Sequence, residues 1–115
     1  MKEKRKVDLN SYLKEGVSAL IGRQNGKNFF KELKGSGIDI MEDGEWLISI
    51  PDRIITINNS YFQGFFAPVF EHCGGRDKFL NKYEFHASEH IQNKVKKYVD
   101  SLALTTSPSE ISGID

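Results

Sequence analysis

The sequence contains 115 residues, of which 28% are charged and 38% are hydrophobic, and its formal net charge is zero. These values are typical of one globular domain with a real core, and the absence of excess positive charge argues against nucleic acid as a partner. No apolar run approaches the ~18 residues of a membrane span, and the lone Cys73 excludes an internal disulfide, so we expect a cytoplasmic protein without membrane contact.

Three parts are expected along the chain. Residues 1–14 are predicted to form a lead-in or an edge strand, and residues 15–104 to form the folded domain. Residues 105–115, TTSPSEISGID, are rich in Ser, Thr, Pro and Gly, which predicts a disordered tail.

The first helix is predicted after the stretch GRQNGK. Gly22 and Gly26 bracket a turn-prone loop, and a helix should follow over residues 26–34, with Phe29, Phe30 and Leu33 on one face. The Gly-Ser-Gly at 35–37 should end this helix.

A β-rich region should come next. Ile38 and Ile40 alternate with Asp39, and Asp43-Gly44 separates them from the apolar run 46–50, which predicts a hairpin. A further strand is expected over residues 54–57.

Apolar residues at helical spacing predict a second helix over residues 60–73. Asn59 or Ser60 is expected to cap it, and Pro68 should kink the helix or make it restart. After it, the sequence predicts a short helical turn, a strand over 83–86 and a final amphipathic helix that begins after Ser88.

This order of elements predicts an α/β (α+β) fold with a small mixed β-sheet and helices packed on one of its sides.

No pattern of catalytic or metal-binding residues stands out. His72 and Cys73 are neighbours, so on a helix their side chains point about 100° apart and cannot act as a dyad. His86 and His90 fall on different predicted elements and need not converge. We therefore expect a protein that is not an enzyme and that uses no cofactor or metal.

The stretch GRQNGK also offers an anion site, because Arg23 and Lys27 stand at a helix start. It has three residues between its glycines and no Ser or Thr after the Lys, so it is not a Walker A loop. A turn whose Arg pairs with an acidic neighbour is the favoured interpretation.

Aromatic side chains are dense on the helix at 60–73. Tyr61, Phe62, Phe65, Phe66 and Phe70 cover well over half of its circumference, more than one sheet can bury. We therefore expect part of this set to be exposed or to be buried against a partner or a second copy. The alternative is that the Pro68 kink and a covering C-terminal segment bury all of them.

Four stretches, LIGRQNGKNFFKEL, WLISI, ITINNSYFQGFF and GGRDKFLNKYEF, together with the terminal helix, resemble the STAS-like domain family DUF4325. The resemblance covers residues 17–103 and extends distantly to the STAS domains of anti-sigma factor antagonists. In those antagonists a partner with a histidine-kinase-like ATPase fold phosphorylates a Ser at a helix start, and the phosphate abolishes docking.

The resemblance implies that Ser60 is the candidate phosphoacceptor of a non-catalytic regulatory domain that binds a protein partner. The expected partner surface is the Ser60 corner and the aromatic helix 60–73, with the residues Asn58, Asn59, Ser60, Tyr61, Phe62, Phe65 and Phe66. Two alternatives stay open: a phosphate- or nucleotide-binding domain that uses Arg23, Lys27 and Ser60, and a structural homo-oligomer.

Overall fold

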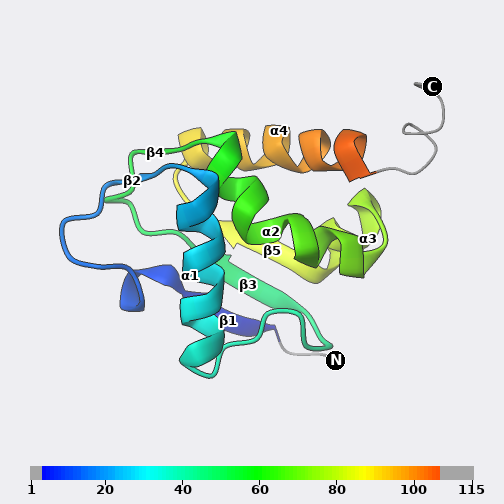
Figure 1. Cartoon of the computed structure of the whole chain (residues 1–115), viewed down its shortest axis with the longest axis horizontal. Helices are drawn as coiled ribbons and strands as arrows, with labels where there is room; N and C mark the ends of the chain where they lie inside the picture. The colour runs from blue at the N-terminus through cyan, green and yellow to red at the C-terminus, as the bar shows by residue number, and fades with distance from the viewer. Residues whose placement is uncertain (1–3, 107–115) are drawn as a thin grey trace.

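The computed structural model describes residues 4–106, without the side chains of 105 and 106, and has an α/β fold (Figure 1). The strands are β1 (Arg5–Asp8), β2 (Ala19–Leu20), β3 (Trp46–Ser49), β4 (Thr56–Ile57) and β5 (Tyr83–His86). The helices are α1 (Arg23–Gly35), α2 (Asn59–Cys73), α3 (Arg76–Lys82) and α4 (Glu89–Thr106), and a 3-10 turn, η1, spans Leu9–Ser11. The α/β fold class expected from the sequence is confirmed.

Every strand pair of the described residues is parallel, so the expected mixed sheet is wrong. One sheet has the order β1-β3-β5, and β2 pairs with β4 in a separate two-stranded sheet. The predicted hairpin over 38–50 does not form, because the neighbours of β3 come from distant parts of the chain. Residues 38–45 instead make turns, in which Ile40 is buried and the Asp39 carboxylate accepts from the backbone N–H of Met41.

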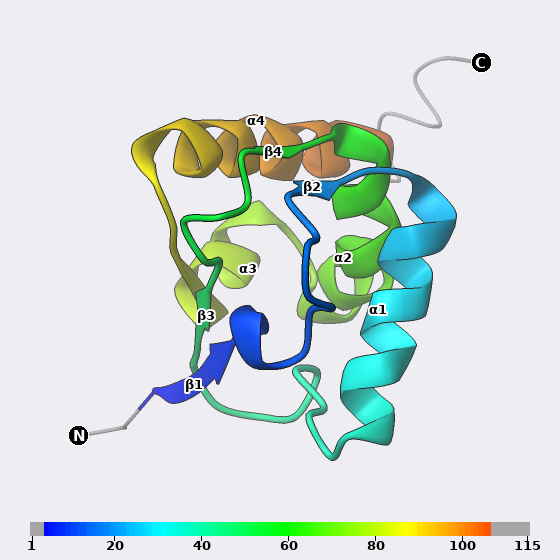
Figure 2. The same cartoon turned by 90° about the vertical axis from the view of Figure 1, so that its left-hand side faces the viewer.

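The three-stranded sheet presents one face to the core. Along β3, Trp46 and Ile48 are buried, whereas Leu47 and Ser49 are half-buried, as the two-residue period of a strand requires. Figure 2 shows α1, α2 and α3 on the same side of β1 and β3, and α4 runs above them in that view. The helices therefore pack against the inner face of this sheet, and the core lies between them.

Helix α2 lies at the centre of the helical layer, between α1 and α4 (Figure 1). Its aromatic rings each meet a different element. Ring centroids are 5.7 Å apart for Phe65 and Phe29 of α1, and 5.5 Å apart for Phe66 and Phe85 of β5. Phe62 packs on Tyr98 of α4 at 5.8 Å and Phe70 on Phe79 of α3 at 5.4 Å. A helix that is enclosed on several sides can bury more than one face.

The expectation that part of this aromatic set is exposed is therefore wrong. Tyr61, Phe62, Phe65, Phe66 and Phe70 are each at most 6% exposed within the single chain. Four elements cover α2, whereas the expectation assumed cover by one sheet. Helix α2 also continues through Pro68, which is exposed, instead of restarting there.

Two element boundaries also differ from expectation. Helix α1 begins at Arg23 rather than at Gly26, so the expected loop between Gly22 and Gly26 is the first turn of the helix. Helix α4 extends to Thr106, so the tail expected at 105–115 starts inside a helix, and its remainder lies outside the described residues.

Candidate functional site at the start of two helices

Helices α1 and α2 touch through their backbones near their first turns. A Cβ atom on Gly26 would lie 2.2 Å from the carbonyl oxygen of Tyr61, and one on Gly64 would lie 2.1 Å from that of Arg23. Such distances are far below van der Waals contact, so only glycine fits at both positions. The two glycines hold the N-terminal turns of α1 and α2 side by side.

The Asn58 side chain joins the two helix starts. Its Oδ1 accepts from the backbone N–H of Tyr61 at 2.9 Å, which caps α2, and from that of Gly22 at 3.2 Å, at the start of α1. Its own backbone N–H donates to the Leu20 carbonyl at 3.0 Å. The cap expected at Asn59 or Ser60 is therefore one or two residues too late, and Ser60 does not cap this helix.

Ser60 is exposed and is the second residue of α2. Within residues 4–106 its hydroxyl has no hydrogen-bond partner. The free N–H groups of a helix start and the helix dipole stabilise negative charge in the first turn. Ser60 therefore presents a free hydroxyl where an added phosphate would be favoured.

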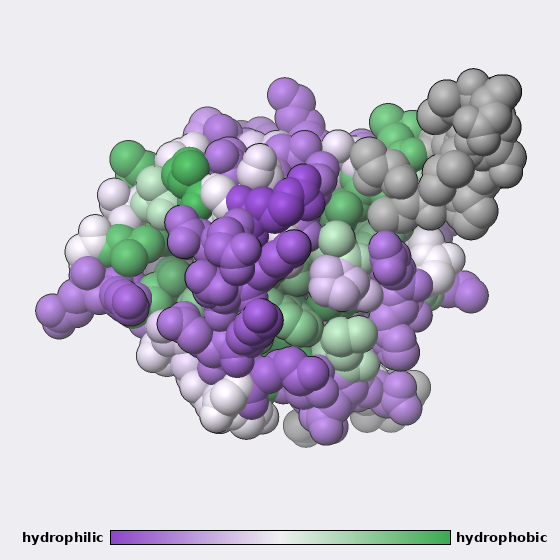
Figure 3. Space-filling model, in the orientation of Figure 1, coloured by the Kyte–Doolittle hydropathy of each residue, from purple (hydrophilic) through white to green (hydrophobic). Residues whose placement is uncertain are grey.

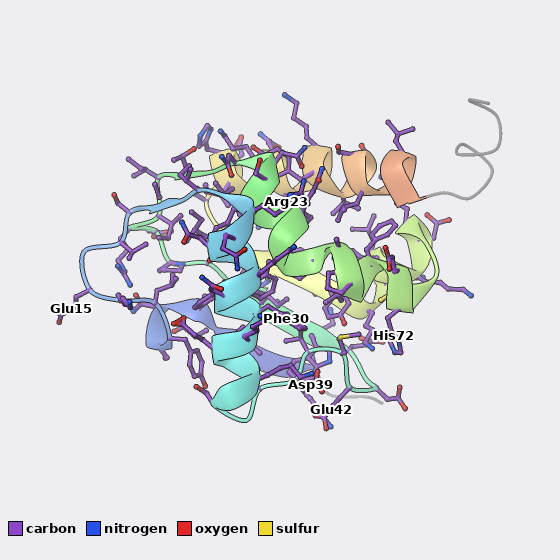
Figure 4. All side chains as sticks on the ribbon, in the orientation of Figure 1. Glu15, Arg23, Phe30, Asp39, Glu42 and His72 are labelled. Carbon is purple, nitrogen blue, oxygen red and sulfur yellow. The ribbon has the colours of Figure 1, made fainter. Side chains whose placement is uncertain are left out.

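Arg23 points from α1 toward α2, where its guanidinium donates to the side-chain oxygen of Gln63 at 2.9 Å (Figure 4). The expected pairing of Arg23 with an acidic neighbour is therefore wrong. Gln63 is three residues after Ser60 and lies on the same face of α2, since residues three apart are neighbours on a helix. Arg23 and Ser60 consequently flank the same corner.

Two cationic side chains, Arg23 and Lys27, stand on α1 near this corner. Lys27 follows Arg23 by about one turn and is exposed, and neither side chain forms an ion pair with a described residue. The surface over the first turns of α1 and α2 is mostly hydrophilic, with hydrophobic patches next to it (Figure 3). Two helix N-termini and two cations meet here, an arrangement that favours an anion.

The other residues of the predicted partner surface lie deeper. Asn58 and Asn59 are half-buried, and the Asn59 amide nitrogen contacts the Ser101 hydroxyl of α4 at 3.5 Å. Tyr61, Phe62, Phe65 and Phe66 lie in the core. Of the seven predicted residues, only Ser60 is exposed.

Nucleophilic and metal-binding side chains do not gather elsewhere among the described residues. Burial raises the pKa of the half-buried Cys73 thiol, which disfavours the reactive thiolate. His86 of β5 contacts the Glu84 carboxylate at 3.0 Å. No group of three or more His, Cys, Asp and Glu side chains suited to a metal occurs in the part of the chain that the structure describes.

Sequence reasoning missed the roles of Gly26, Gly64 and Gln63. A glycine inside an apolar helix was the available signal, because it costs helix stability and usually has a packing reason. Gln63 carried no signal, since its role depends on how the two helices pack.

Within residues 4–106 no helix is long and apolar enough to cross a bilayer. Comparisons with protein-family models, with curated proteins and with solved structures found no match to this chain.

Proposed function

We propose that this chain is a non-catalytic STAS-like regulatory domain, which binds a cytoplasmic protein partner at the corner of α1 and α2 and is released by phosphorylation of Ser60. The observation that carries this proposal is the position of Ser60, which is exposed in the first turn of α2 with a free hydroxyl, on the helix face where Arg23 donates to Gln63. The resemblance of LIGRQNGKNFFKEL and ITINNSYFQGFF to the family supports the same residue. A histidine-kinase-like ATPase is the proposed partner class.

The contact surface differs from the one expected from the sequence. The aromatic rings lie in the core beneath the corner, and Ile21 is the exposed apolar side chain next to it. Ile21 is 44% exposed and directly precedes Gly22 at the start of α1. An exposed aliphatic side chain next to a polar, switchable serine suits a regulated protein interface.

Substitutions at Ser60 test the switch. The tagged protein is incubated with Mg-ATP and extract of its native host, phosphorylated residues are mapped by mass spectrometry, and bound proteins are quantified. We expect phosphate on Ser60, and a partner that is retained by Ser60→Ala and lost from Ser60→Asp, because negative charge changes the docking face. Ser11→Asp is the matched control, since Ser11 is exposed on η1. Equal partner recovery by Ser60→Ala and Ser60→Asp would refute the switch.

The phosphate- or nucleotide-binding alternative retains a geometric basis, because Arg23 and Lys27 lack acidic partners among the described residues. It requires that the unmodified protein bind inorganic phosphate or ATP. NMR titration should then shift the amides of residues 23–27 and 59–61 in the wild type and not in the double variant Arg23→Gln, Lys27→Gln. The homo-oligomer alternative rested on exposed aromatic rings, and these are buried within one chain.

A further inference from the structure

Strand β5 is an edge of the three-stranded sheet, whose order is β1-β3-β5. The backbone groups of successive residues in a strand point alternately to its two sides. The His86 carbonyl accepts from the Ile50 N–H at 2.8 Å, at the end of β3. Glu84 and His86 therefore bond to β3, and the backbone groups of Tyr83 and Phe85 face away from it, toward the open edge.

Helices α3 and α4 use part of this open edge. The Tyr83 N–H donates to the Phe79 carbonyl of α3, and the Phe85 carbonyl accepts from the Gln92 side chain of α4 at 3.1 Å. The Tyr83 carbonyl and the Phe85 N–H have no hydrogen-bond partner among residues 4–106. These two groups lie on either side of Glu84, so one residue of a parallel strand placed opposite Glu84 can bond to both.

A groove of about 250 Å³ lies beside this edge, and β5, the end of α3 and α4 line it. Its apolar part comes from Leu80 of α3 and from Val95 and Val99 of α4. Leu80 is 39% exposed, whereas the two valines are buried. An apolar side chain of an added strand would cover Leu80, so the groove offers contacts to side chains as well as to backbone.

The groove carries an excess of positive charge. Its charged lining residues are Lys4, Lys82, Glu84 and Lys96. Glu84 is already paired, because the Lys4 ammonium group donates to its carboxylate. The Lys82 ammonium group donates to the Met41 carbonyl at 3.2 Å, and neither Lys82 nor Lys96 forms an ion pair with a described residue. Carboxylates of a bound segment can therefore pair with these two lysines.

An acidic peptide fits this edge better than a second copy or a nucleic acid does. Antiparallel pairing of two β5 edges around the free groups would place Glu84 directly opposite its own copy, and like charges in that position are destabilising. The Tyr83 carbonyl needs a donor beside an acceptor, which a peptide backbone supplies and a phosphate backbone does not.

We propose that the open edge of β5 binds an extended, acidic segment of a partner protein, which adds to the sheet as a further parallel strand. One residue of the segment donates its N–H to the Tyr83 carbonyl and accepts from the Phe85 N–H. Its neighbours place apolar side chains over Leu80, and acidic residues farther along the segment pair with the two lysines. None of these residues belongs to the Ser60 corner, so this surface is independent of the proposed function.

Peptides of the form acetyl-Glu-X-Thr-X-Glu-amide, in which X is Val, Ile, Leu or Phe, serve as probes. They are titrated into the full chain, and binding is followed by NMR. We expect the Phe85 amide proton to shift downfield and to exchange more slowly with solvent, because it gains an acceptor. The same peptides with Lys in place of Glu should bind roughly tenfold more weakly. No binding of the Glu peptides, or equal affinity for both sets, would overturn the proposal.

A backbone-modified peptide tests whether the segment joins the sheet. An N-methyl group on the central Thr removes the donor for the Tyr83 carbonyl, so affinity should fall about fivefold. Unchanged affinity would show that the peptide does not bind as a strand. A shift of the Phe85 amide that depends on protein concentration without any peptide would instead assign the edge to a second copy, and the proposal would fail.

Two matched pairs of variants locate the peptide. Leu80→Ser should weaken binding roughly tenfold, whereas Leu104→Ser, at a leucine that is 65% exposed on α4 outside the groove, should leave it unchanged. Lys96→Glu should likewise weaken binding of the Glu peptides roughly tenfold, and Lys97→Glu, also exposed on α4 but outside the groove, clearly less. Equal effects within each pair would reject the groove as the docking site.

Discussion

Asn58 shows how a single side chain can organise the corner between two helices. It accepts from the backbone at Gly22 and Tyr61 while its own backbone follows β4, so three segments meet at one residue. The sequence predicted a polar cap here but placed it at Asn59 or Ser60. The residue types at positions 58, 59 and 60 are all good caps, and only the geometry of the preceding strand selects among them.

Asn58→Ala should lower the free energy of unfolding by about 1–2 kcal/mol, because both backbone donors lose their acceptor. Asn58→Asp keeps an acceptor oxygen in the same place, so it should lower the free energy of unfolding much less than Asn58→Ala does. Urea unfolding followed by circular dichroism measures both. A loss in Asn58→Asp as large as that in Asn58→Ala would show that the cap is not the main role of this residue.

Three buried or half-buried tyrosines predict weaker stability at alkaline pH. Burial raises the pKa of Tyr61, Tyr83 and Tyr98 above the ordinary value of 10.0. The unfolded chain therefore releases these protons at lower pH than the folded chain does. The stabilisation is complete below a pH of about 10 and declines as pH rises above it.

Ultraviolet absorbance of phenolate, recorded beside circular dichroism, measures this effect. We expect most of the phenolate signal to appear together with loss of helix. Full ionisation of all four tyrosines of the sequence while the helical signal is intact would contradict the buried positions.

At the scale of elements, the contact between α1 and α2 determines which residues are exposed. Periodicity predicted the existence of these helices, because apolar spacing is a local property. It did not predict the parallel sheets, since β3 pairs with β1 and β5, which lie far away along the chain in each direction. Nor could it predict that α2 is covered on several sides, because cover depends on those distant contacts.

The two contact glycines should tolerate no side chain. Gly26→Ala and Gly64→Ala should each destabilise the protein by at least about 3 kcal/mol, because the new methyl group meets backbone that cannot move aside. Gly35→Ala is the matched control. Gly35 also lies in α1, and no atom lies within 4 Å of a Cβ added there. Its replacement by Ala should raise the free energy of unfolding by about 0.5–1 kcal/mol. Thermal unfolding compares the three, and similar melting temperatures would contradict the backbone contact.

For the whole molecule, the aromatic rings around α2 form the core rather than an interface. Phe65 is 2% exposed and its ring meets those of Phe29, Phe30 and Phe66. The composition predicted a domain with a real core, and helical spacing predicted the apolar face of α1 with Phe29 and Leu33. The sequence pattern predicted that part of this aromatic set is exposed or buried against a partner, since it lacked the three-dimensional arrangement that places four elements around one helix.

Phe65→Ala should lower the free energy of unfolding by about 3–5 kcal/mol. Phe30→Ala, which removes a half-buried ring of the same cluster, should lower it clearly less. Chemical denaturation of both variants gives the comparison. If Phe65→Ala instead left stability unchanged and abolished partner recovery, the ring would belong to an interface.

Trp46 gives the protein an internal optical reporter. It is the one tryptophan of the sequence, is 3% exposed on the central strand β3, and its indole N–H donates to the Glu42 carbonyl at 3.2 Å. The Arg5 guanidinium lies 5.1 Å from the ring centroid, so the indole also senses β1 at the sheet edge. Its fluorescence emission should therefore shift to longer wavelength when the sheet opens to water. Events at the Ser60 corner that leave the sheet intact should leave this emission unchanged, which separates a local switch from global unfolding without any added label.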